Sequence, residues 1–293
     1  TVSVPIGLGF GPDAGRIEIQ GQGYKFKFPG IFLPIDRSNS PPGLLLQPGR
    51  NAAILGGDIL LNGGVITAPS GNIALGSVRG GFVGLNPNGT LDYSGISNFG
   101  LIETRSAAAL DASGIGGGSI HLQAGNIQLG QSTLIIQNFG IQPAGNISLN
   151  ATNTIVVEKN SGNIRNETVG TGAGGSIALS AKQLILRDGI EISTRSFGSA
   201  IGGNVDVNAS EEVLIDSVLF SQDRGVTPSS LSSLALNSGR AGNVNVSTKV
   251  LRILNGAVIS STTAGIGDGG EVNVWASDRT EIIGLSQPSS FLV

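Results

Sequence analysis

Acidic side chains are the residues of this sequence with the greatest capacity for chemistry. Paired carboxylates can divide the roles of general acid and general base when a fold holds them close together. The candidates are spread over the second half of the chain: Asp188, Glu191, Asp206, Glu211, Glu212, Asp216, Asp223, Asp268 and Glu271. Asp188 and Asp216 align with Asn255 at one turn of a repeat, a recurrence that turn chemistry itself requires. No Arg, Lys or His gathers with these acids in the sequence, so we predict no catalytic residues.

The other reactive residue types are scarce. His121 is the only histidine and Trp275 the only tryptophan, and there is no cysteine. One histidine without cysteine cannot build an ordinary zinc site, and it leaves no choice of partners for a Ser-His-Asp triad. His121 falls between Ile120 and Leu122, so it should face solvent if those two face a core. We therefore predict no metal-binding residues, no cofactor-binding residues and no enzymatic activity.

Composition excludes several other classes of function. The 293 residues carry a net charge of −3, and 13% of them are charged, without a basic cluster interleaved with aromatic residues. Nucleic acid is therefore not an expected partner. No apolar run reaches the length that spans a membrane. With 39% hydrophobic residues the chain can bury a core.

A repeat organises the chain, and its clearest copy covers residues 174–194. It holds three runs of alternating apolar residues: Ile177/Leu179, Leu184/Leu186 and Ile190/Ile192. A two-residue period is typical of a strand with one buried face. Asp188-Gly189 supplies a turn between the second and third runs. We expect Leu179 and Leu186 to point inward.

Glycines open successive copies of this unit. They stand at residues 118, 145, 175, 203, 242 and 270, so the steps are 27, 30, 28, 39 and 28 residues. Three short strands for each step, with a glycine at each return, predict one coil of an all-β, parallel β-helix that stacks on the next coil at about 4.8 Å. Gly-Asn pairs that begin at residues 71, 125, 145, 162, 203 and 242 could form stacked amide ladders.

The repeats also predict the domain organisation. Residues 1–50, which hold seven of the 12 prolines, are expected to form an irregular flank or cap. Residues 51–293 are expected to form the β-helix, most clearly over 118–283. The 39-residue step predicts a surface insertion near 221–230, with no inward position between Gln222 and Ser229. Such a loop could bind a ligand or be a tolerated insertion without a role, and the sequence leaves both open.

Four phrases of the sequence resemble exoproteins of the filamentous haemagglutinin family, the large cyanobacterial type in particular. They are Val4-Pro-Ile-Gly-Leu-Gly-Phe10, Gly57-Asp-Ile-Leu-Leu-Asn-Gly-Gly-Val-Ile-Thr-Ala-Pro69, Gly71-Asn-Ile-Ala-Leu-Gly-Ser77 and Ala112-Ser-Gly-Ile-Gly-Gly-Gly118. The resemblance implies a right-handed parallel β-helix that lies in a longer chain, after its secretion domain. It also implies export by two-partner secretion, through an outer-membrane transporter of the parent protein.

Two classes of function follow from these observations. The favoured one is a non-enzymatic rod, secreted or on the cell surface, that acts as an adhesin or a structural spacer and binds an unidentified surface or carbohydrate ligand. The alternative is a carbohydrate-active β-helix, a lyase or hydrolase of polysaccharide. A cluster of carboxylates with a basic residue in one lateral groove would favour the enzyme.

Overall fold

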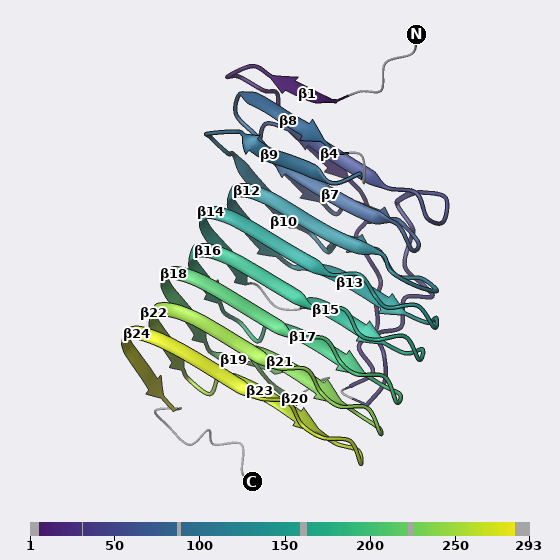
Figure 1. Ribbon diagram of the computed structural model, residues 1–293, viewed down its shortest axis with the longest axis vertical. Helices are drawn as coiled ribbons and strands as arrows, with labels where there is room; N and C mark the ends of the chain where they lie inside the picture. Colours follow the sequence, from purple (N-terminus) through teal and green to yellow (C-terminus); the bar gives the residue numbers. More distant parts are fainter. Residues whose placement is uncertain (1–5, 31, 87–88, 159–162, 222–224, 285–293) are drawn as a thin grey trace.

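The computed structural model describes residues 6–30, 32–86, 89–158, 163–221 and 225–284. These residues form strands and turns and no α-helix, and their long parallel sheets wind into a solenoid (Figure 1). One sheet has eleven strands and the other has eight. The predicted all-β parallel β-helix is therefore confirmed.

The eleven-stranded sheet, called the long sheet here, supplies two sides of each coil. Its strands are β2 (Ile17–Gln20), β4 (Ala52–Gly56), β5 (Ile59–Asn62), β7 (Asn72–Ser77), β10 (Leu101–Arg105), β12 (Ser119–Gly130), β14 (Ile147–Glu158), β16 (Ile177–Leu186), β18 (Val205–Asp216), β22 (Val244–Leu254) and β24 (Val272–Ile283). From β12 onward, a register shift near the middle of each strand bends it around a corner. The first two apolar runs of the predicted repeat are thus one bent strand.

The eight-stranded sheet, called the short sheet here, supplies the third side. Its strands are β3 (Leu44–Leu45), β6 (Val65–Thr67), β11 (Ala108–Asp111), β13 (Ser132–Asn138), β15 (Asn163–Thr168), β17 (Glu191–Ser196), β21 (Ser230–Ala235) and β23 (Val258–Thr263). Parallel pairing in register places equivalent residues of successive coils side by side. Six such residues form one buried inward column: Ile66, Leu110, Leu134, Ile164, Ile192 and Leu231.

The predicted core positions are confirmed. Leu179 and Leu186 are buried, as are Ile177, Leu184 and Ile192. Leu179 lies in register between Leu149 of the preceding coil and Val207 of the next. Burying such columns removes apolar surface from water along the whole solenoid, and this is the main source of its stability.

The opening glycines are required by close contact between coils. A Cβ atom on Gly203 would lie 1.9 Å from the carbonyl oxygen of Gly175, and one on Gly242 would lie 2.0 Å from that of Gly203. Only glycine fits such a return point. The side chains that follow these glycines cap the backbone of the next coil. Asn204 Oδ1, for example, accepts a hydrogen bond from the backbone N–H of Asn243, at 2.8 Å. The Gly-Asn ladders predicted from the sequence therefore join side chains to backbone N–H groups. Asn126 and Asn163 do not occupy the return point, because Asn126 lies inside β12 and Asn163 is the first residue of β15.

One corner of the coil uses left-handed backbone conformations. Asp188, Ser217 and Asn255 have φ values of 64°, 69° and 51°. The predicted alignment of Asp216 with Asp188 and Asn255 is off by one residue, because Asp216 pairs in register with Leu254. Ser217 instead takes the left-handed position, and its hydroxyl accepts a hydrogen bond from the backbone N–H of Asp188. Asp216 accepts one from the Asn255 side chain.

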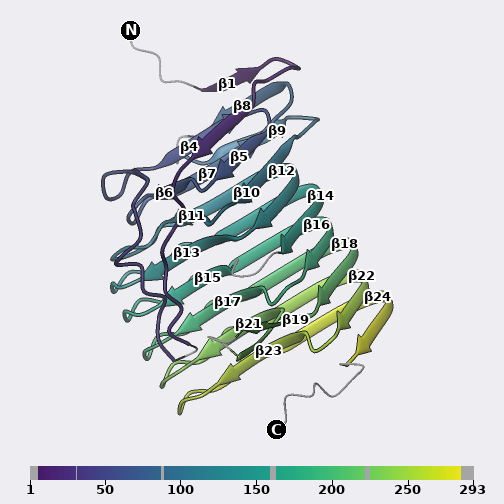
Figure 2. The same cartoon turned by 180° about the vertical axis from the view of Figure 1, so that it is seen from behind.

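The first fifty residues serve three structural purposes. β1 (Gly7–Phe10) joins β8 (Gly81–Leu85) and β9 (Leu91–Gly95) in a small antiparallel sheet at one end of the solenoid. β2 is already a parallel member of the long sheet, next to β5, although it precedes residue 51. Residues 24–30 and 32–42, called the strap here, then cross the outer face of the short sheet before β3 (Figure 2).

The insertion in the 39-residue step is an antiparallel hairpin of β19 (Val218–Ser221) and β20 (Gly225–Pro228). It starts earlier and ends earlier than the predicted range of 221–230. Ser229 and Ser230 are buried, and Leu231 takes the inward position beside Ile192. Gln222, Asp223 and Arg224 lie outside the described residues. We predicted no inward position between Gln222 and Ser229. This prediction is wrong at Ser229, which is buried and whose hydroxyl accepts a hydrogen bond from the backbone N–H of Gly189.

Candidate binding cleft beneath the strap

The outer face of the short sheet carries charged residues where the strap crosses it. Because Ile164 and Ile192 point inward, their neighbours on β15 and β17 point outward. The register pairs Asn163 with Glu191, and Glu167 with Arg195. Asn163, Glu167 and Arg195 are nevertheless buried, and the strap residue Ile35 lies over Glu167.

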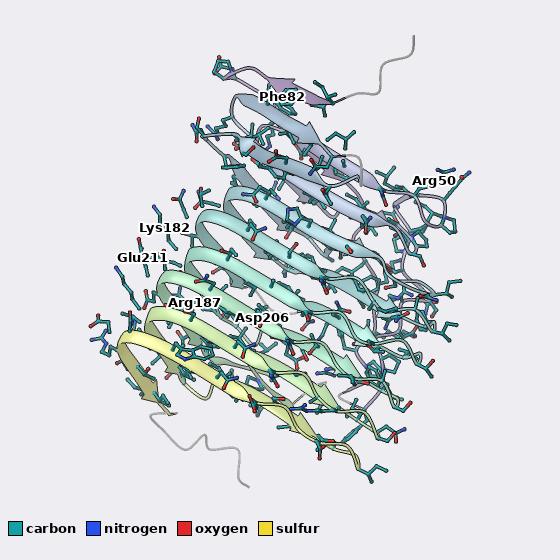
Figure 3. All side chains as sticks on the ribbon, viewed as in Figure 1. Arg50, Phe82, Lys182, Arg187, Asp206 and Glu211 are labelled. Atoms are coloured by element: carbon teal, nitrogen blue, oxygen red, sulfur yellow. The ribbon has the colours of Figure 1, made fainter. Side chains whose placement is uncertain are left out.

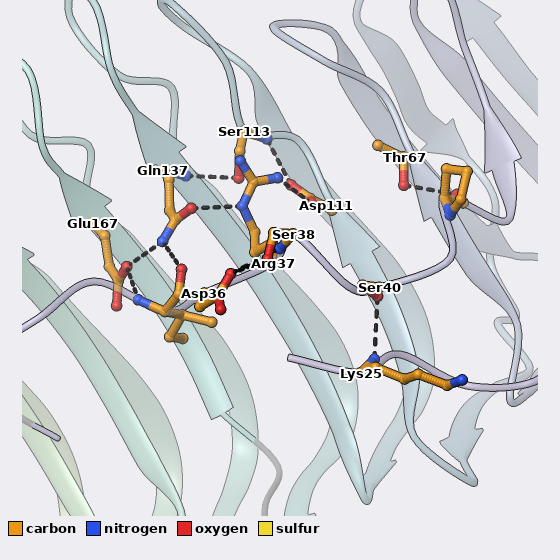
Figure 4. A network of polar contacts seen from close by, with 12 residues as sticks. Lys25, Asp36, Arg37, Ser38, Ser40, Thr67, Asp111, Ser113, Gln137 and Glu167 are labelled. Carbon is orange, nitrogen blue, oxygen red and sulfur yellow. Dashed lines mark hydrogen bonds and ion pairs between the residues drawn. The ribbon is translucent and has the colours of Figure 1, made fainter. Parts of the chain in front are cut away.

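A chain of polar contacts ties the strap to the sheet (Figure 4). Arg37 of the strap pairs with Asp111 of β11 and donates a hydrogen bond to Gln137 Oε1 of β13. Gln137 Nε2 donates to Glu167 Oε2 of β15 at 2.7 Å and to the carbonyl oxygen of Ile35 at 2.8 Å. The backbone N–H of Ile35 donates to the same Glu167 oxygen. The fully buried Glu167 carboxylate is thus stabilised by donors from both the sheet and the strap.

An apolar cluster accompanies these polar contacts. Phe26 and Ile35 of the strap pack on Val65, Ala109 and Ile135, which are outward residues of three successive strands of the short sheet. Tyr24 stacks on Phe26 with ring centroids 4.6 Å apart. The strap therefore has a small core of its own, separate from the interior of the solenoid.

Two arginines lie beyond the end of the polar chain. Arg165 Nη2 and Arg195 Nη2 both donate to the carboxylate of Glu191, the latter at 3.0 Å. The side chains of Arg165 and Arg195 are each 4% exposed, while that of Glu191 is 20% exposed. Burial, together with the nearby charge of Arg165, lowers the pKa of Arg195 to about 10. The Arg195 guanidinium therefore remains cationic at neutral pH.

A cleft of about 460 Å³ opens over these groups. Arg165, Arg195 and Glu191 form its charged floor, the strap provides one wall through Phe28, Pro29 and Leu33, and the hairpin provides another through Val226, Thr227 and Pro228. Among the described residues, Arg165 Nε and Nη1 make no hydrogen bond, although Nη1 lies 3.9 Å from Glu167 Oε1. Buried donors of this kind are costly unless they are paired.

The cleft corrects one prediction from the sequence. We expected no basic residue to gather with the acids, yet the coil register brings Arg165 and Arg195 to Glu191. Arg165, Glu167 and Arg195 were not among the candidates. The alternating sequences of β15 and β17 could have revealed this cluster. Aligning Ile164 with Ile192 places the two arginines and the two glutamates of these strands on one outward face.

The other candidate acids are dispersed. Asp206, Glu212 and Asp216 have local partners on the outer surface, while Glu211, Asp268 and Glu271 are exposed. Figure 3 shows Glu211 and Lys182 on the bent edge of the long sheet, and Asp206 on its outer face. Asp223 lies outside the described residues.

His121 and Trp275 also have defined positions. His121 faces outward between Ile120 and Leu122, as the alternation predicts, but it is only half-exposed, because the ring of Tyr93 from the small antiparallel sheet lies 6.4 Å away. Burial lowers the pKa of His121. Trp275 is 60% exposed beside Asn245 and Asp206, two members of an outward ladder in which Asn245 Nδ2 donates to Asp206 Oδ1.

Within the described ranges, no three His, Asp or Glu side chains lie close enough together to hold a metal ion. Nor do the described residues include a helix with the length and apolarity needed to cross a membrane. Comparison with models of protein families, with curated proteins and with solved structures found no match to this chain.

Proposed function

We propose that the chain is a non-enzymatic β-helical rod, an adhesin or structural spacer of a larger surface protein. The observation that carries the proposal is the continuous parallel pairing from β5 to β24, which places equivalent outward side chains of successive coils side by side along the solenoid. Solenoids of this kind present long, stiff surfaces to partners.

The uneven outer surface supports the adhesin form of this proposal. The strap, the hairpin and the cleft between them are additions to the repeat, and additions to a solenoid are where binding residues concentrate. The long sheet supports the spacer form. Among the described strands, β24 pairs only with β22, and it exposes Val274 and Ile282. A further strand could add to this edge.

Export and location are part of the same proposal. The four phrases that resemble filamentous haemagglutinin-family exoproteins support secretion through an outer-membrane transporter of a two-partner system. The surface or carbohydrate ligand of the rod is then one that it meets outside the cell.

A specific observation favours a second candidate, a carbohydrate-active β-helix. The cleft holds acidic and basic side chains in one lateral groove, as such an enzyme requires. Two features weigh against turnover there. Glu167 is fully buried beneath Ile35, and the carboxylate of Glu191 is already engaged by two guanidinium groups. A general acid or base must instead reach the substrate.

One experiment separates the two candidates. The purified chain is incubated with acidic and neutral polysaccharides, and retention on each polymer is measured beside the release of reducing ends and unsaturated products. We expect no product above that of a heat-unfolded control. Product release that Glu191→Gln abolishes, and that Glu211→Gln leaves intact, would establish the enzyme. Glu211 is a suitable control because it is exposed and lies away from the cleft.

A further inference from the structure

Trp275 lines an open groove on the outer face of the long sheet, which the strap does not cross. The groove has a volume of about 220 Å³ and spans four strands, β16, β18, β22 and β24. The register sets Trp275 of β24 beside Ser247 of β22. The same outward column continues through Asn208 of β18 and Ser180 of β16. All four side chains are exposed, so the column faces water along this length.

A second outward column, two residues earlier in each strand, has polar groups that satisfy one another. Asn273 Nδ2 donates to Asn245 Oδ1 at 3.1 Å, and Asn245 Nδ2 donates to Asp206 Oδ1 at 2.7 Å. The three polar side chains of the first column instead have no hydrogen-bond partner among the described residues. The amide and hydroxyl groups beside Trp275 are therefore free to bind a ligand.

The groove combines an aromatic wall with a polar floor. Trp275 is 60% exposed, and an indole ring offers a flat apolar face. Apart from Ala178, the outward side chains of the floor carry hydroxyl, amide or carboxylate groups. A purely apolar ligand would take water from these groups without replacing its hydrogen bonds, which costs free energy. A matching ligand is therefore apolar on one face and forms hydrogen bonds around its rim.

Charge and size narrow the class of ligand further. Asp206, which Figure 3 shows on the outer face, is the one charged side chain among the described residues that line the groove. It repels an anion and accepts hydrogen bonds from hydroxyl groups. The volume lies below that of pockets that enclose drug-sized ligands, so the groove suits a single ring. An uncharged pyranose meets these requirements, because its C–H face is apolar and its rim carries hydroxyl groups.

We propose that this groove binds one neutral hexose ring of a glycan, which stacks on Trp275 and forms hydrogen bonds with Asn208 and Asp206. The inference rests on the adhesin form of the proposed function, and it names the chemical class of the ligand. The coil register creates the site, because the indole of Trp275 and the amide of Asn208 come from different coils.

The fluorescence of Trp275 reports directly on the groove, because Trp275 is the only tryptophan of the chain. The full chain is titrated with the methyl glycosides of glucose, galactose and mannose, and at least one should give a saturable change. Sorbitol has hydroxyl groups but no ring face, and the uronic acid of the tightest sugar is anionic. Both should bind at least tenfold more weakly than that sugar. No saturable change with any glycoside, or equal affinity for either analogue, would overturn the proposal.

Tetramethylammonium tests the other kind of ligand that an indole and a carboxylate attract, an organic cation. It should bind at least tenfold more weakly than the tightest glycoside, because it cannot form hydrogen bonds with the free amide and hydroxyl groups of the floor. Affinity equal to or above that of the glycoside would identify a cation site and overturn the proposal.

Substitutions locate the site. Trp275→Ala should abolish glycoside binding in titration calorimetry, and Asn208→Ala should weaken it at least fivefold in either measurement. Asn150→Ala is the matched control, because Asn150 continues the same outward column beyond Ser180 but does not line the groove. It should leave the affinity unchanged. Circular dichroism checks that all three variants fold. Unchanged affinity in Trp275→Ala or in Asn208→Ala would overturn the proposed site, as would an equal loss in Asn150→Ala.

The outcome is separable from the proposed function. If no glycoside binds while a polysaccharide still retains the chain, the groove is wrong, and the adhesin remains. If polysaccharide is cleaved while a glycoside binds as expected, the non-enzymatic rod is wrong, and the groove stands.

Discussion

The side chains on the two faces of the short sheet contact different parts of the molecule. On its inner face, Ile164 of β15 touches Leu134 of the preceding coil and Ile192 of the next, and the same kind of residue recurs in every coil. On its outer face, Arg165 is in register with Ile135 on one side and Ser193 on the other. The inner residue is dictated by the repeat, since each coil meets another coil. The outer residue is dictated by a non-repeating strap, and function can therefore vary there without cost to the solenoid.

The comparison predicts that the largest loss of stability comes from a charge on an inner face. Leu179→Asp places a carboxylate between Leu149 and Val207, where no partner is available, and should cost several kcal/mol. Because neighbouring coils share this column, the loss should spread to both sides. Chemical denaturation gives the free energy of unfolding, and hydrogen exchange gives its spread.

Ser180→Asp is the matched control, since it adds the same charge one residue later on the exposed outer face. It should change the free energy of unfolding by less than about 0.5 kcal/mol. A control variant as unstable as Leu179→Asp would show that inner and outer faces have been exchanged.

The second prediction concerns the outer face beneath the strap. Glu167→Ala removes the acceptor of the Ile35 N–H, one of the two acceptors of Gln137 Nε2 and one of the two carboxylates beside Arg165, and should cost roughly 3 kcal/mol. This loss should be local. Trypsin should cleave the strap after Lys25, Lys27 or Arg37 much faster than in the parent, while the solenoid stays protected. Glu211→Ala, an exposed control, should leave strap cleavage unchanged.

If instead Glu167→Ala unfolds the whole chain in one transition, the strap is an integral part of the solenoid. The distinction between a repeating interior and an independent outer layer would then fail.

The inner face was predictable from the sequence, and the layer beneath the strap was not. The alternation of apolar residues located Leu179 and Leu186, and the repeat period located the opening glycines. Each of these residues packs against the equivalent residue of the neighbouring coil, so the repeat itself predicts it. Arg165, Glu167 and Arg195 instead acquire their environment from the strap, the hairpin and Gln137 of the preceding coil, all more than twenty residues away in the sequence. No local pattern records such contacts.

The third prediction tests the close contact between coils at their return points. Gly203→Ala adds a methyl group 1.9 Å from the Gly175 carbonyl oxygen, and should cost about 1–3 kcal/mol through displaced backbone. Gly9→Ala in β1 is the control, because nothing lies within 4 Å of an added Cβ there. Thermal unfolding should separate the two variants clearly. Equal midpoints would mean that the coils can move apart at no cost.

The smallest predicted effect belongs to His121, the one outward residue of the long sheet with a titration near neutral pH. Burial under Tyr93 lowers its pKa in the folded chain below the ordinary value of 6.5. As pH falls through 6.5, the unfolded chain takes up a proton that the folded chain resists, so the folded state loses stability. The contribution of neutral His121 to the free energy of unfolding is fully present above pH 6.5, and it is lost as the pH falls below the pKa of His121 in the folded chain.

The pH dependence of urea unfolding isolates this contribution. Between pH 8 and pH 5 the parent should lose more stability than His121→Gln, because His121 is the only imidazole in the chain and pH 5 still lies above the ordinary Asp pKa of 3.8. The amide of Gln can still reach Ser148 Oγ, the present partner of His121 Nδ1. Ser148→Ala, which removes that partner but keeps the imidazole, should retain the pH dependence. Parallel curves for the parent and His121→Gln would mean that the small antiparallel sheet does not cover His121, and that this part of the long sheet is as open to water as its repeat pattern predicts.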